Sequence, residues 1–377
     1  MRLLNATTLR LETFYEEATP SYAILSHTWG SDEVTFGELE SLPTLSKSSQ
    51  TRTRILQSKG YYKIKKCCAQ AVEDGLQYSW VDTCCINKRS SAELSEAINS
   101  MFKWYKQAHI CYAYLSDVNV KDAEFASFDR SYLEGARWFT RGWCLQELIA
   151  PKEIVFFARS WKRLGKKSEI SSVLTDITNI DESILLGASL STTSLSRRMS
   201  WASLRSTTRT EDLAYCLMGL FNVNMPLLYG EGPKAFIRLQ EEIMKDSDDH
   251  SLFAWVPDAA RFLPTLDLHI DFPRCRPIWS TWKEKSDTPD LAAVSENVRG
   301  VFASHPGEFS ASWILQPRPG FLPLALDQPG EEEFDWGGDA GEGYAADAFA
   351  SGGGEGAGEG EDGGFEFGEG GYEGLFE

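Results

Sequence analysis

The sequence lacks an excess of basic residues: it has 37 Lys and Arg against 55 Asp and Glu, and a formal net charge of −18. Nucleic-acid binding depends on neutralising phosphates, so this composition argues against a nucleic-acid partner. No run approaches 18 apolar residues, and the N-terminus lacks a long apolar core followed by a small-residue cleavage site. We therefore expect no membrane span, no secretion signal and no membrane partner.

Disulfide and metal-binding patterns are also missing. The eight cysteines include two adjacent pairs, Cys67 with Cys68 and Cys84 with Cys85. Neighbouring cysteines do not easily both enter a regular disulfide framework, so we interpret them as reduced thiols of a cytoplasmic protein. A zinc site formed by these thiols and His109 is the less favoured alternative, because the spacing is CC rather than CxxC. We predict small buried side chains here and no metal site.

The acidic charge is concentrated at one end of the chain. Between Glu331 and Glu377 there are 15 acidic residues and no Lys or Arg, so the remainder carries a net charge of only −3. Such a Gly-rich, acidic composition cannot bury enough apolar surface to order itself, and residues 329–377 are predicted to be disordered. Scattered aromatic residues leave open the binding of an unknown protein partner, although a solvated tail is favoured. Residues 256–328, rich in Pro and weakly periodic, form a poorly specified extension.

Strand and helix patterns alternate through residues 1–160. Strands are predicted at Tyr22–Leu25 (with Ser26, His27 and Trp29 following), 78–81, 109–118 and 153–158. Helices are predicted at 61–75, 93–108 and 141–150. This alternation predicts an α/β fold with a central, mainly parallel sheet flanked by helices.

The helix over 93–108 has the clearest pattern, because positions 94, 98, 101, 105 and 108 share one apolar face. Ser90 and Glu93 have the spacing of a capping box at its start. From 161 to 255 the pattern is helical, with one helix over 208–221 capped by Thr210 and another over 232–246 with Pro233 in its first turn. We predict an appended helical portion there.

Six stretches in a fixed order identify a family. They are YAILSHTWG, WVDTCCINKRSSAELSEAINSMFKWYKQA, YAYLSDV, RWFTRGWCLQELIAPKEIVFF, RRMSWASLRSTTRTEDLAYCLMGLFNVNMPLLYGEGPKAFIRLQEEI and DDHSLFAW. Together they resemble the fungal HET domain, the module of heterokaryon (vegetative) incompatibility proteins. The resemblance covers residues 22–255. It implies a cytoplasmic fungal protein that triggers cell death when genetically different hyphae fuse.

The resemblance also implies a fold and a chemistry. HET domains look like distant relatives of TIR domains, which are flavodoxin-like α/β folds of innate immunity. The segment GWCLQEL is similar to the WCLxEL segment of plant TIR domains, whose Glu is the catalytic residue of NAD hydrolysis, and that Glu falls on Glu147. This implies an NAD+ nucleosidase with NAD as substrate and no cofactor. The alternative is a non-enzymatic signalling module that acts by homotypic assembly into an oligomer.

The sequence departs from the family pattern in several places. HET domains commonly have Asp at the position of Asn87, Thr at that of Cys144, and a basic residue near Leu213, so no role is carried over to these three positions. The usual companion domains are not indicated, because there is no Walker A pattern and no 40-residue period. The absence of GxGxxG also argues against an ordinary dinucleotide oxidoreductase.

Glu147 is the candidate catalytic residue. On a helix it lies about 40° from Trp143, on the apolar side. A carboxyl so placed is desolvated, which raises its pKa, or meets a partner in a cleft. Its structural alternatives are an ion pair with Arg141 or the capping of a nearby loop. The candidate ligand-binding residues are Ser26, His27, Trp29, Asp82, Arg141 and Trp143.

The candidate residues are expected to converge because ligands of open parallel sheets bind outside the carboxyl ends of the strands. Trp29 or Trp143 would stack on a nicotinamide or adenine ring, and Asp82 would bind a ribose hydroxyl; packing and turn-capping roles are the alternatives. A cysteine-hydrolase triad of Cys84, His27 and Asp82 is a remote third possibility.

Overall fold

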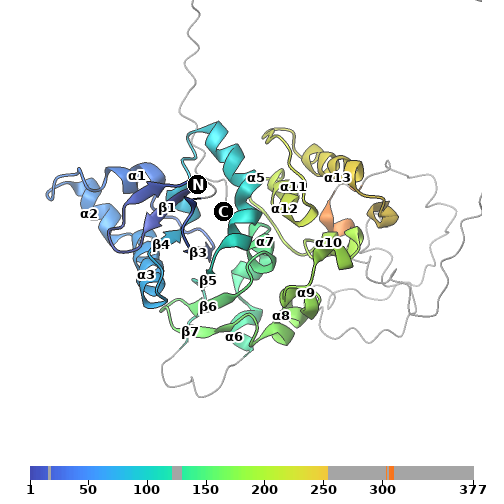
Figure 1. The fold of residues 1–377 in the computed structure, drawn as a ribbon, viewed down its shortest axis with the longest axis horizontal. Coiled ribbons are helices and arrows are strands. Elements are labelled where there is room, and N and C mark those ends of the chain that lie inside the picture. Colours follow the sequence, from blue (N-terminus) through green and yellow to red (C-terminus); the bar gives the residue numbers. More distant parts are fainter. Residues whose placement is uncertain (16–17, 121–129, 254–302, 304, 310–377) are drawn as a thin grey trace, which may run out of the picture. The chain divides into compact units, whose positions relative to one another are not determined.

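The fold of the described residues is built on a seven-stranded sheet with the order β2-β1-β4-β3-β5-β6-β7 (Figure 1). The computed structural model describes residues 1–15, 18–120, 130–253, 303 and 305–309. The predicted acidic tail and most of the predicted 256–328 extension lie outside these residues. The strands are β1 Arg2–Asn5, β2 Leu11–Thr13, β3 Tyr22–His27, β4 Tyr78–Trp80, β5 Ile110–Leu115, β6 Ile154–Ala158 and β7 Arg163–Lys166.

The four central strands, β4, β3, β5 and β6, run parallel. Strands β1 and β2 on one side and β7 on the other pair antiparallel. The predicted α/β class with a mainly parallel central sheet is therefore confirmed. The chain enters the parallel part at β3, moves outward to β4 and then crosses back to β5 and β6, which is the flavodoxin-like order. The reversal lies between β3 and β5, where such sheets open a crevice at their carboxyl ends.

Strand β3 is buried along its whole length. The sequence predicted that the strand would end at Leu25, but it continues through Ser26 and His27, and that prediction is wrong. Both polar side chains find buried hydrogen-bond partners, Glu147 for Ser26 and Asp82 for His27, so the strand can carry them into the core. Asp82, predicted in a loop, begins a short helix directly after β4.

The hairpin of β1 and β2 was not predicted from the sequence. Leu3 and Leu4 of β1 are fully buried, and β1 pairs with the edge of β4. The Asn5 side chain accepts hydrogen bonds from the backbone N–H groups of Thr7 and Thr8 at 3.1 and 3.0 Å, which closes the turn. These strands are too short for a period-2 pattern to stand out in the sequence.

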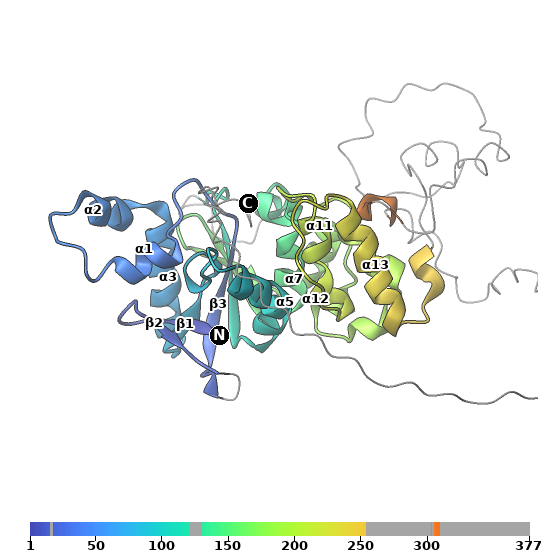
Figure 2. The same cartoon turned by 90° about the horizontal axis from the view of Figure 1, so that it is seen from above.

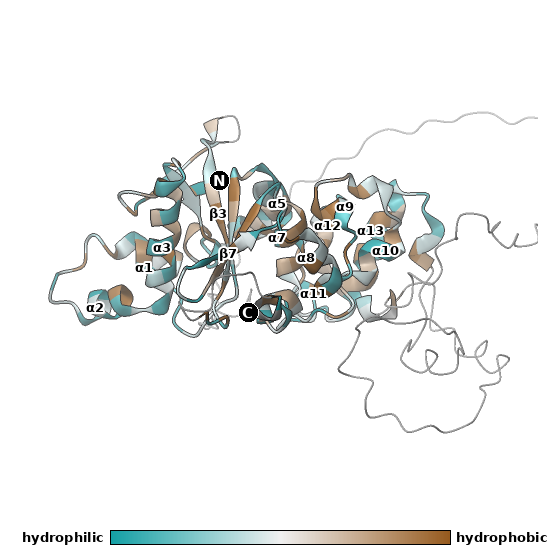
Figure 3. Cartoon of the chain, turned by 90° about the horizontal axis from the view of Figure 1, so that it is seen from below, coloured by the Kyte–Doolittle hydropathy of each residue, from teal (hydrophilic) through white to brown (hydrophobic). Residues whose placement is uncertain are grey.

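Helices cover both faces of the sheet (Figure 2). On one face lies α3, whose end receives a hydrogen bond from Tyr112 of β5 to Asp74 at 2.5 Å. On the other face lie α5 and α7; Trp80 of β4 packs edge-on against Trp104 and Tyr105 of α5. The helices of this part are α1 Phe36–Ser41, α2 Gln50–Gln57, α3 Lys59–Glu73, α4 Asp82–Cys85, α5 Ser91–Gln107, α6 Ser131–Glu134, 3-10 helix η3 Arg137–Thr140 and α7 Trp143–Ile149. Figure 3 shows the hydrophobic strands between these helical layers.

Helix α5 confirms the predicted apolar face, because positions 94, 98, 101, 105 and 108 are all buried. Its N-terminus is capped as predicted by Ser90, whose hydroxyl accepts from the Glu93 N–H at 3.3 Å. The reciprocal half of the capping box is wrong. The Glu93 carboxylate instead accepts from the backbone N–H of Asn87 at 2.8 Å and from Arg2 at 2.6 Å, so it ties β1 to this helix.

The helical portion follows the sheet, which ends at Lys166 of β7. Its elements are α8 Ser171–Thr178, α9 Glu182–Leu185, η4 Leu190–Thr192, α10 Leu195–Ser200, α11 Asp212–Tyr215, α12 Met218–Phe221, α13 Lys234–Asp246 and η5 His250–Phe253. The predicted helix at 232–246 is confirmed as α13. The single predicted helix at 208–221 is wrong, because it is broken into α11 and α12. The break lets Gly219 pack on Phe102 of α5, where a Cβ would lie 2.1 Å from the Phe102 Cβ.

The predicted Thr210 cap is also wrong, because Glu211 occupies the N-cap of α11. The Glu211 carboxylate accepts hydrogen bonds from the backbone N–H groups of Gly230 and Gly232 at 2.8 and 3.0 Å. It therefore fastens the loop before α13 to the start of α11.

Residues far along the chain complete the core of the helical portion. The Gln240 side chain of α13 exchanges two hydrogen bonds with the backbone of Ala303, at 2.7 and 3.0 Å. The 3-10 helix η8, Pro306–Phe309, packs on α10, and Phe309 is fully buried. Across the described residues, the helices are all too short or too polar to cross a bilayer.

Candidate functional site

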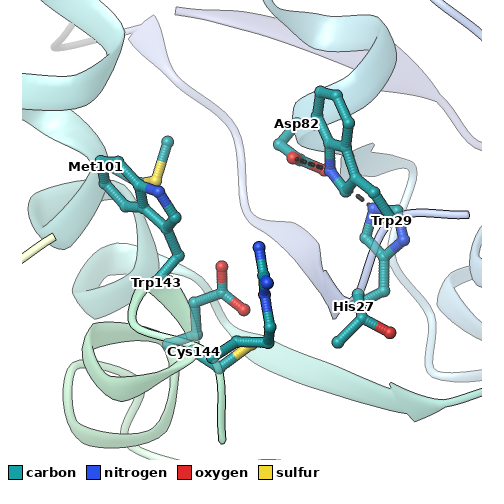
Figure 4. A pocket seen from close by; sticks show the side chains of 9 residues that line it. His27, Trp29, Asp82, Met101, Trp143 and Cys144 are labelled. Atoms are coloured by element: carbon teal, nitrogen blue, oxygen red, sulfur yellow. Dashed lines mark hydrogen bonds and ion pairs between the residues drawn. The ribbon is translucent and has the colours of Figure 1, made fainter. Parts of the chain in front are cut away.

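A narrow cleft opens where β3 and β4 end and α7 begins (Figure 4). It lies at the carboxyl ends of the parallel strands, next to the reversal between β3 and β5, where a crevice is expected. The lining residues are His27, Thr28, Trp29, Asp82, Met101, Arg141, Trp143, Cys144 and Glu147. All of the sequence-predicted site residues except Ser26 are among them. Ser26 lies beneath the cleft and contacts Glu147 through its hydroxyl.

The cleft has two walls that come from different parts of the fold. In Figure 4, Met101, Trp143 and Cys144 lie on one side, and His27, Trp29 and Asp82 lie on the other. The first wall is built by α5 and α7, and the second by the ends of β3 and β4. Three lining residues, Thr28, Met101 and Cys144, were not predicted as site residues, since a threonine after a strand and a methionine or cysteine on an apolar helix face carry no signal beyond packing.

Glu147 lies in α7, a helix whose residues are all buried. Its carboxyl group accepts a hydrogen bond from the Ser26 hydroxyl, which in turn accepts one from the Trp138 indole at 2.7 Å. Trp138 itself packs edge-on against Phe139 and Phe156. The carboxyl group is thus held at the end of a chain of buried donors that fixes its orientation.

Burial raises the pKa of Glu147 to about 8, and the negative charge of Asp82 adds to the rise. Hydrogen bonds from Ser26, Tyr105 and Cys144 oppose the rise but do not cancel it. The side chain is therefore mostly protonated at neutral pH. Arg141, the alternative ion-pair partner, donates instead to the Thr208 hydroxyl at 3.3 Å.

Asp82 is clamped on both of its oxygens. The Nε2 of His27 lies 2.9 Å from Oδ1, and the Trp29 indole donates to Oδ2 at 2.7 Å. Burial disfavours the charge, but His27, Lys88 and Trp29 outweigh it and lower the pKa of Asp82 to about 2. Asp82 is thus an ionised anchor that holds the other wall of the cleft.

Further charged residues lie behind the wall that His27, Trp29 and Asp82 form. The Nζ of Lys63, on α3, lies 2.8 Å from Nδ1 of His27 and forms an ion pair with Glu33. Glu33 also accepts a hydrogen bond from the Gly30 N–H at 2.7 Å. The Nζ of Lys88 lies 3.2 Å from the centre of the Trp29 ring. Neither lysine was predicted as a site residue, because nothing in the local sequence shows that a lysine on a helix or in a turn is buried.

The helical portion contributes the support for α7. The backbone of Ser206 accepts from the Gly142 N–H at 2.9 Å and donates to Thr140 at 2.8 Å. The buried Arg205 guanidinium donates to the Arg141 carbonyl at 3.0 Å, and burial lowers its pKa to about 10. These contacts fix the point at which the Glu147 helix begins.

Asp212 belongs to the same support. Burial raises its pKa to about 7, while hydrogen bonds from Trp143 and Tyr229 favour its charged form. The Tyr229 hydroxyl lies 3.1 Å from its carboxyl oxygen. Trp143 thus connects the cleft to the helical portion.

The cleft is nearly closed. Its volume is about 10 Å³, which is the space of about one water molecule. A nucleotide ring therefore enters only if a side chain of one wall moves.

The remaining sequence alternatives are less well supported by the geometry. The hydrogen bond with Cys85 and burial raise the pKa of the Cys84 thiol well above its usual range, which leaves it a poor nucleophile. The Cys84 thiol points to the Val81 carbonyl at 3.8 Å. Within the described ranges, no group of three or more His, Cys, Asp and Glu side chains is placed to hold a metal ion.

The Heterokaryon incompatibility protein (HET) family model matches residues 22–131. The chain carries a HET domain. The matched part of the HET domain includes β3, β4 and β5, and with them the wall of His27 and Asp82; Glu147 follows it in sequence. A second model, Domain of unknown function (DUF8212), matches residues 234–317, which include α13 and η8.

A curated relative, the Vegetative incompatibility protein HET-E-1 of Podospora anserina, is 48% identical to this HET domain protein over 233 residues. The match covers 60% of this chain and 16% of the relative, so the chain corresponds to less than a fifth of the relative's length. No solved structure is significantly similar to the chain.

Proposed function

We propose that this HET domain protein acts in heterokaryon incompatibility, signalling non-self recognition and programmed cell death by cleaving NAD in a TIR-like manner at the Glu147 cleft. The similarity to a vegetative incompatibility protein supports the biological role. The observation that carries the chemical part is the buried Glu147 carboxyl group, which faces an ionised Asp82 across a cleft at the strand-order reversal. Environments that push two carboxyl pKa values apart are typical of acid and base pairs in enzymes.

The chemistry of NAD cleavage suits a carboxyl group in such a place. Breaking the bond between nicotinamide and ribose passes through an oxocarbenium-like state, as glycoside hydrolysis does. The positively charged ring of bound NAD favours ionisation of Glu147, so its raised pKa falls when the substrate enters. The resulting carboxylate stabilises the developing charge on the ribose and accepts a proton from the attacking water.

The other cleft residues have complementary roles in this proposal. Trp29 and Trp143 present aromatic rings from opposite walls to the nicotinamide. Arg141 supplies a cation for the diphosphate of the substrate. Ser26 orients Glu147, and Asp82 with His27 holds Trp29 in position.

The test is nicotinamide release from NAD by the purified full chain at high protein concentration, followed by chromatography. Glu147→Gln should reduce release by at least a hundredfold. Glu153→Gln is the matched control, because Glu153 lies just beyond α7, at the surface, and its carboxylate binds Ser168 at 2.9 Å. Equal release by the wild type and Glu147→Gln would exclude Glu147 as the catalytic residue.

A specific observation favours a second function, homotypic assembly without catalysis. The cleft volume of about 10 Å³ leaves no room for a nucleotide in this conformation. In that function, Glu147 and its partners serve only to hold the fold. If the wild type and Glu147→Gln both release no nicotinamide and both kill cells when overexpressed, the assembly function is retained and the enzyme proposal is lost.

The cytoplasm is the proposed location. All of the described cysteines are free and buried, as is typical of proteins in reducing compartments. We propose no nucleic-acid partner, because the described fold carries the near-neutral part of the chain.

A further inference from the structure

Trp29 is already paired with a cation in the described structure. The Nζ of Lys88 lies 3.2 Å from the centre of its ring, at the close end of cation–π geometry. Lys88 follows α4 in the turn that leads to α5, and Trp29 lines the cleft. An aromatic ring attracts a desolvated cation through its quadrupole, and a second cation nearby is repelled by the first.

The surroundings of Lys88 make its charge easy to remove. Burial lowers the pKa of Lys88 to about 7, while the negative groups Asp82 and Glu33 and the thiol of Cys84 oppose that change. Asp82 and Glu33 are themselves held by His27 and Lys63. A proton can therefore leave Lys88 near neutral pH without leaving the two carboxylates unpaired.

We infer that the cleft selects a cationic aromatic ring, the pyridinium ring of an oxidised nicotinamide nucleotide, and that Lys88 releases its proton to solvent when that ring binds beside Trp29. This inference rests on the proposed function and names the substrate form. One N–H bond of the Lys88 ammonium breaks, its electron pair stays on nitrogen, and the proton passes to the buffer. The incoming ring brings one positive charge, which takes the place of the Lys88 charge beside Trp29.

This exchange distinguishes two forms of the same nucleotide. The oxidised ring is a cation and competes with the Lys88 charge, whereas the reduced ring is neutral and does not. Binding of the oxidised form should therefore strengthen as the pH rises through the titration of Lys88, and binding of the reduced form should not. Lys88 is a specificity-determining residue in this scheme and takes no part in bond cleavage.

The experiment is calorimetric titration of the full chain with NAD+ and, separately, with NADH. The Glu147→Gln background prevents turnover and removes the Glu147 carboxyl group, which would otherwise also release a proton on binding. Heats measured at pH 6 in two buffers of different ionisation enthalpy give the number of protons released. With Lys88 present, NAD+ binding should release close to one proton and NADH binding none.

In the same background, Lys88→Met should bind NAD+ about tenfold more tightly at pH 6 and release no proton. This gain in NAD+ affinity should disappear above pH 8, where Lys88 is neutral in the background protein as well. Lys66→Met is the matched control, because Lys66 lies 5.8 Å from the Tyr62 ring on the exposed side of α3. It should leave both the affinity and the proton release unchanged.

Unchanged proton release in Lys88→Met would overturn the inference, and so would equal release with NADH. If Lys88→Met does not fold, Lys88→Arg serves instead: a permanent charge should weaken NAD+ binding and abolish proton release. Nicotinamide release by the chain with native Glu147 separates the two proposals. Turnover without proton release on binding rejects only the role of Lys88, whereas absence of NAD+ binding rejects both.

Discussion

At the scale of single residues, two buried carboxyl groups in one cleft behave in opposite ways. The hydrogen bonds to Glu147 come from the neutral groups of Ser26, Tyr105 and Cys144 and do not offset its burial, so its pKa is raised to about 8. Asp82 is equally deep, but two donors and a nearby lysine lower its pKa to about 2. The difference comes from the partners of each carboxyl group rather than from burial itself.

Glu147 makes the stability of the fold depend on pH. The folded protein holds this proton up to about pH 8, while the unfolded chain releases it near pH 4.5. The stabilising contribution of the protonated Glu147 side chain to folding is therefore complete below pH 4.5 and is lost as the pH rises through 8. Relative to wild type, Glu147→Gln should gain on the order of 3 kcal/mol in free energy of unfolding between pH 5 and 8. Urea denaturation across this range measures the difference, and a difference that does not change with pH contradicts the raised pKa.

Replacing Asp82 should destabilise the fold, in contrast to replacing Glu147. Asp82→Asn removes the negative charge that faces His27 and Lys88 and weakens the acceptor of the Trp29 indole, so we expect a loss of about 3 kcal/mol in free energy of unfolding at pH 7. Its folded pKa of about 2 lies below the ordinary 3.8, so this stabilisation is present above pH 3.8 and fades as the pH falls through 2. Asp176→Asn is the control; Asp176 forms an exposed ion pair with Arg130, and the change should cost less than about 1 kcal/mol. Similar costs for both variants would mean that the clamp does not stabilise the fold.

At the scale of elements, α7 is a short helix whose position is set from outside. Its first residue follows Gly142, and the backbone of Gly142 and of the two residues before it is held by Ser206 and Arg205 of the helical portion. A Cβ at position 142 would lie 2.5 Å from the Thr207 methyl group and 3.1 Å from the Cys216 sulfur. This close approach is the reason that glycine precedes the Glu147 helix.

Gly142→Ala should therefore destabilise the protein by about 1 to 3 kcal/mol and displace α7. In the double variant, Thr207→Ser removes the methyl group that the new Cβ would contact and should restore part of the lost stability. Gly135→Ala is the control, because nothing lies within 4 Å of the added Cβ there. Thermal denaturation of the single and double variants gives the coupling between the two positions. Additive losses in Gly142→Ala and Thr207→Ser would show that the two positions do not interact.

Local patterns allowed part of this architecture to be predicted from the sequence. The buried β3 and the amphipathic α5 and α13 follow from short-range periodicity, and the convergence at the cleft follows from the parallel order of strands. The breaking of 208–221 into two helices was not predictable, because it depends on a contact between Gly219 and Phe102. The same holds for Lys63, Lys88 and Arg205, which become site residues only through contacts distant in sequence.

At the scale of the whole molecule, the helical portion depends on residues that follow it at a distance. Gln240 is fully buried, and its amide is satisfied by the backbone of Ala303. Phe309 fills the core beside α10. The HET domain and its helical portion therefore need the chain to at least residue 309 for a complete core.

Truncation tests this dependence directly. A chain that ends after residue 255 lacks Ala303 and Phe309, which leaves a buried amide unpaired and a cavity in the core. Its melting temperature should fall by roughly 10 °C, whereas a chain that ends after residue 316 should melt like the full protein. Scanning calorimetry of the two truncated chains distinguishes them, and equal melting temperatures would show that 303–309 adds no stability.

The two short strands at the borders of the sheet limit how copies of the protein can join. Strand β2 has only three residues, and β7 is four residues long with an irregular register against β6. Short, irregular border strands offer another chain little backbone to pair with, which is how natural sheets avoid uncontrolled extension. Homotypic assembly, which the alternative function requires, would therefore use helices and loops, because growth by strand addition at these borders is disfavoured.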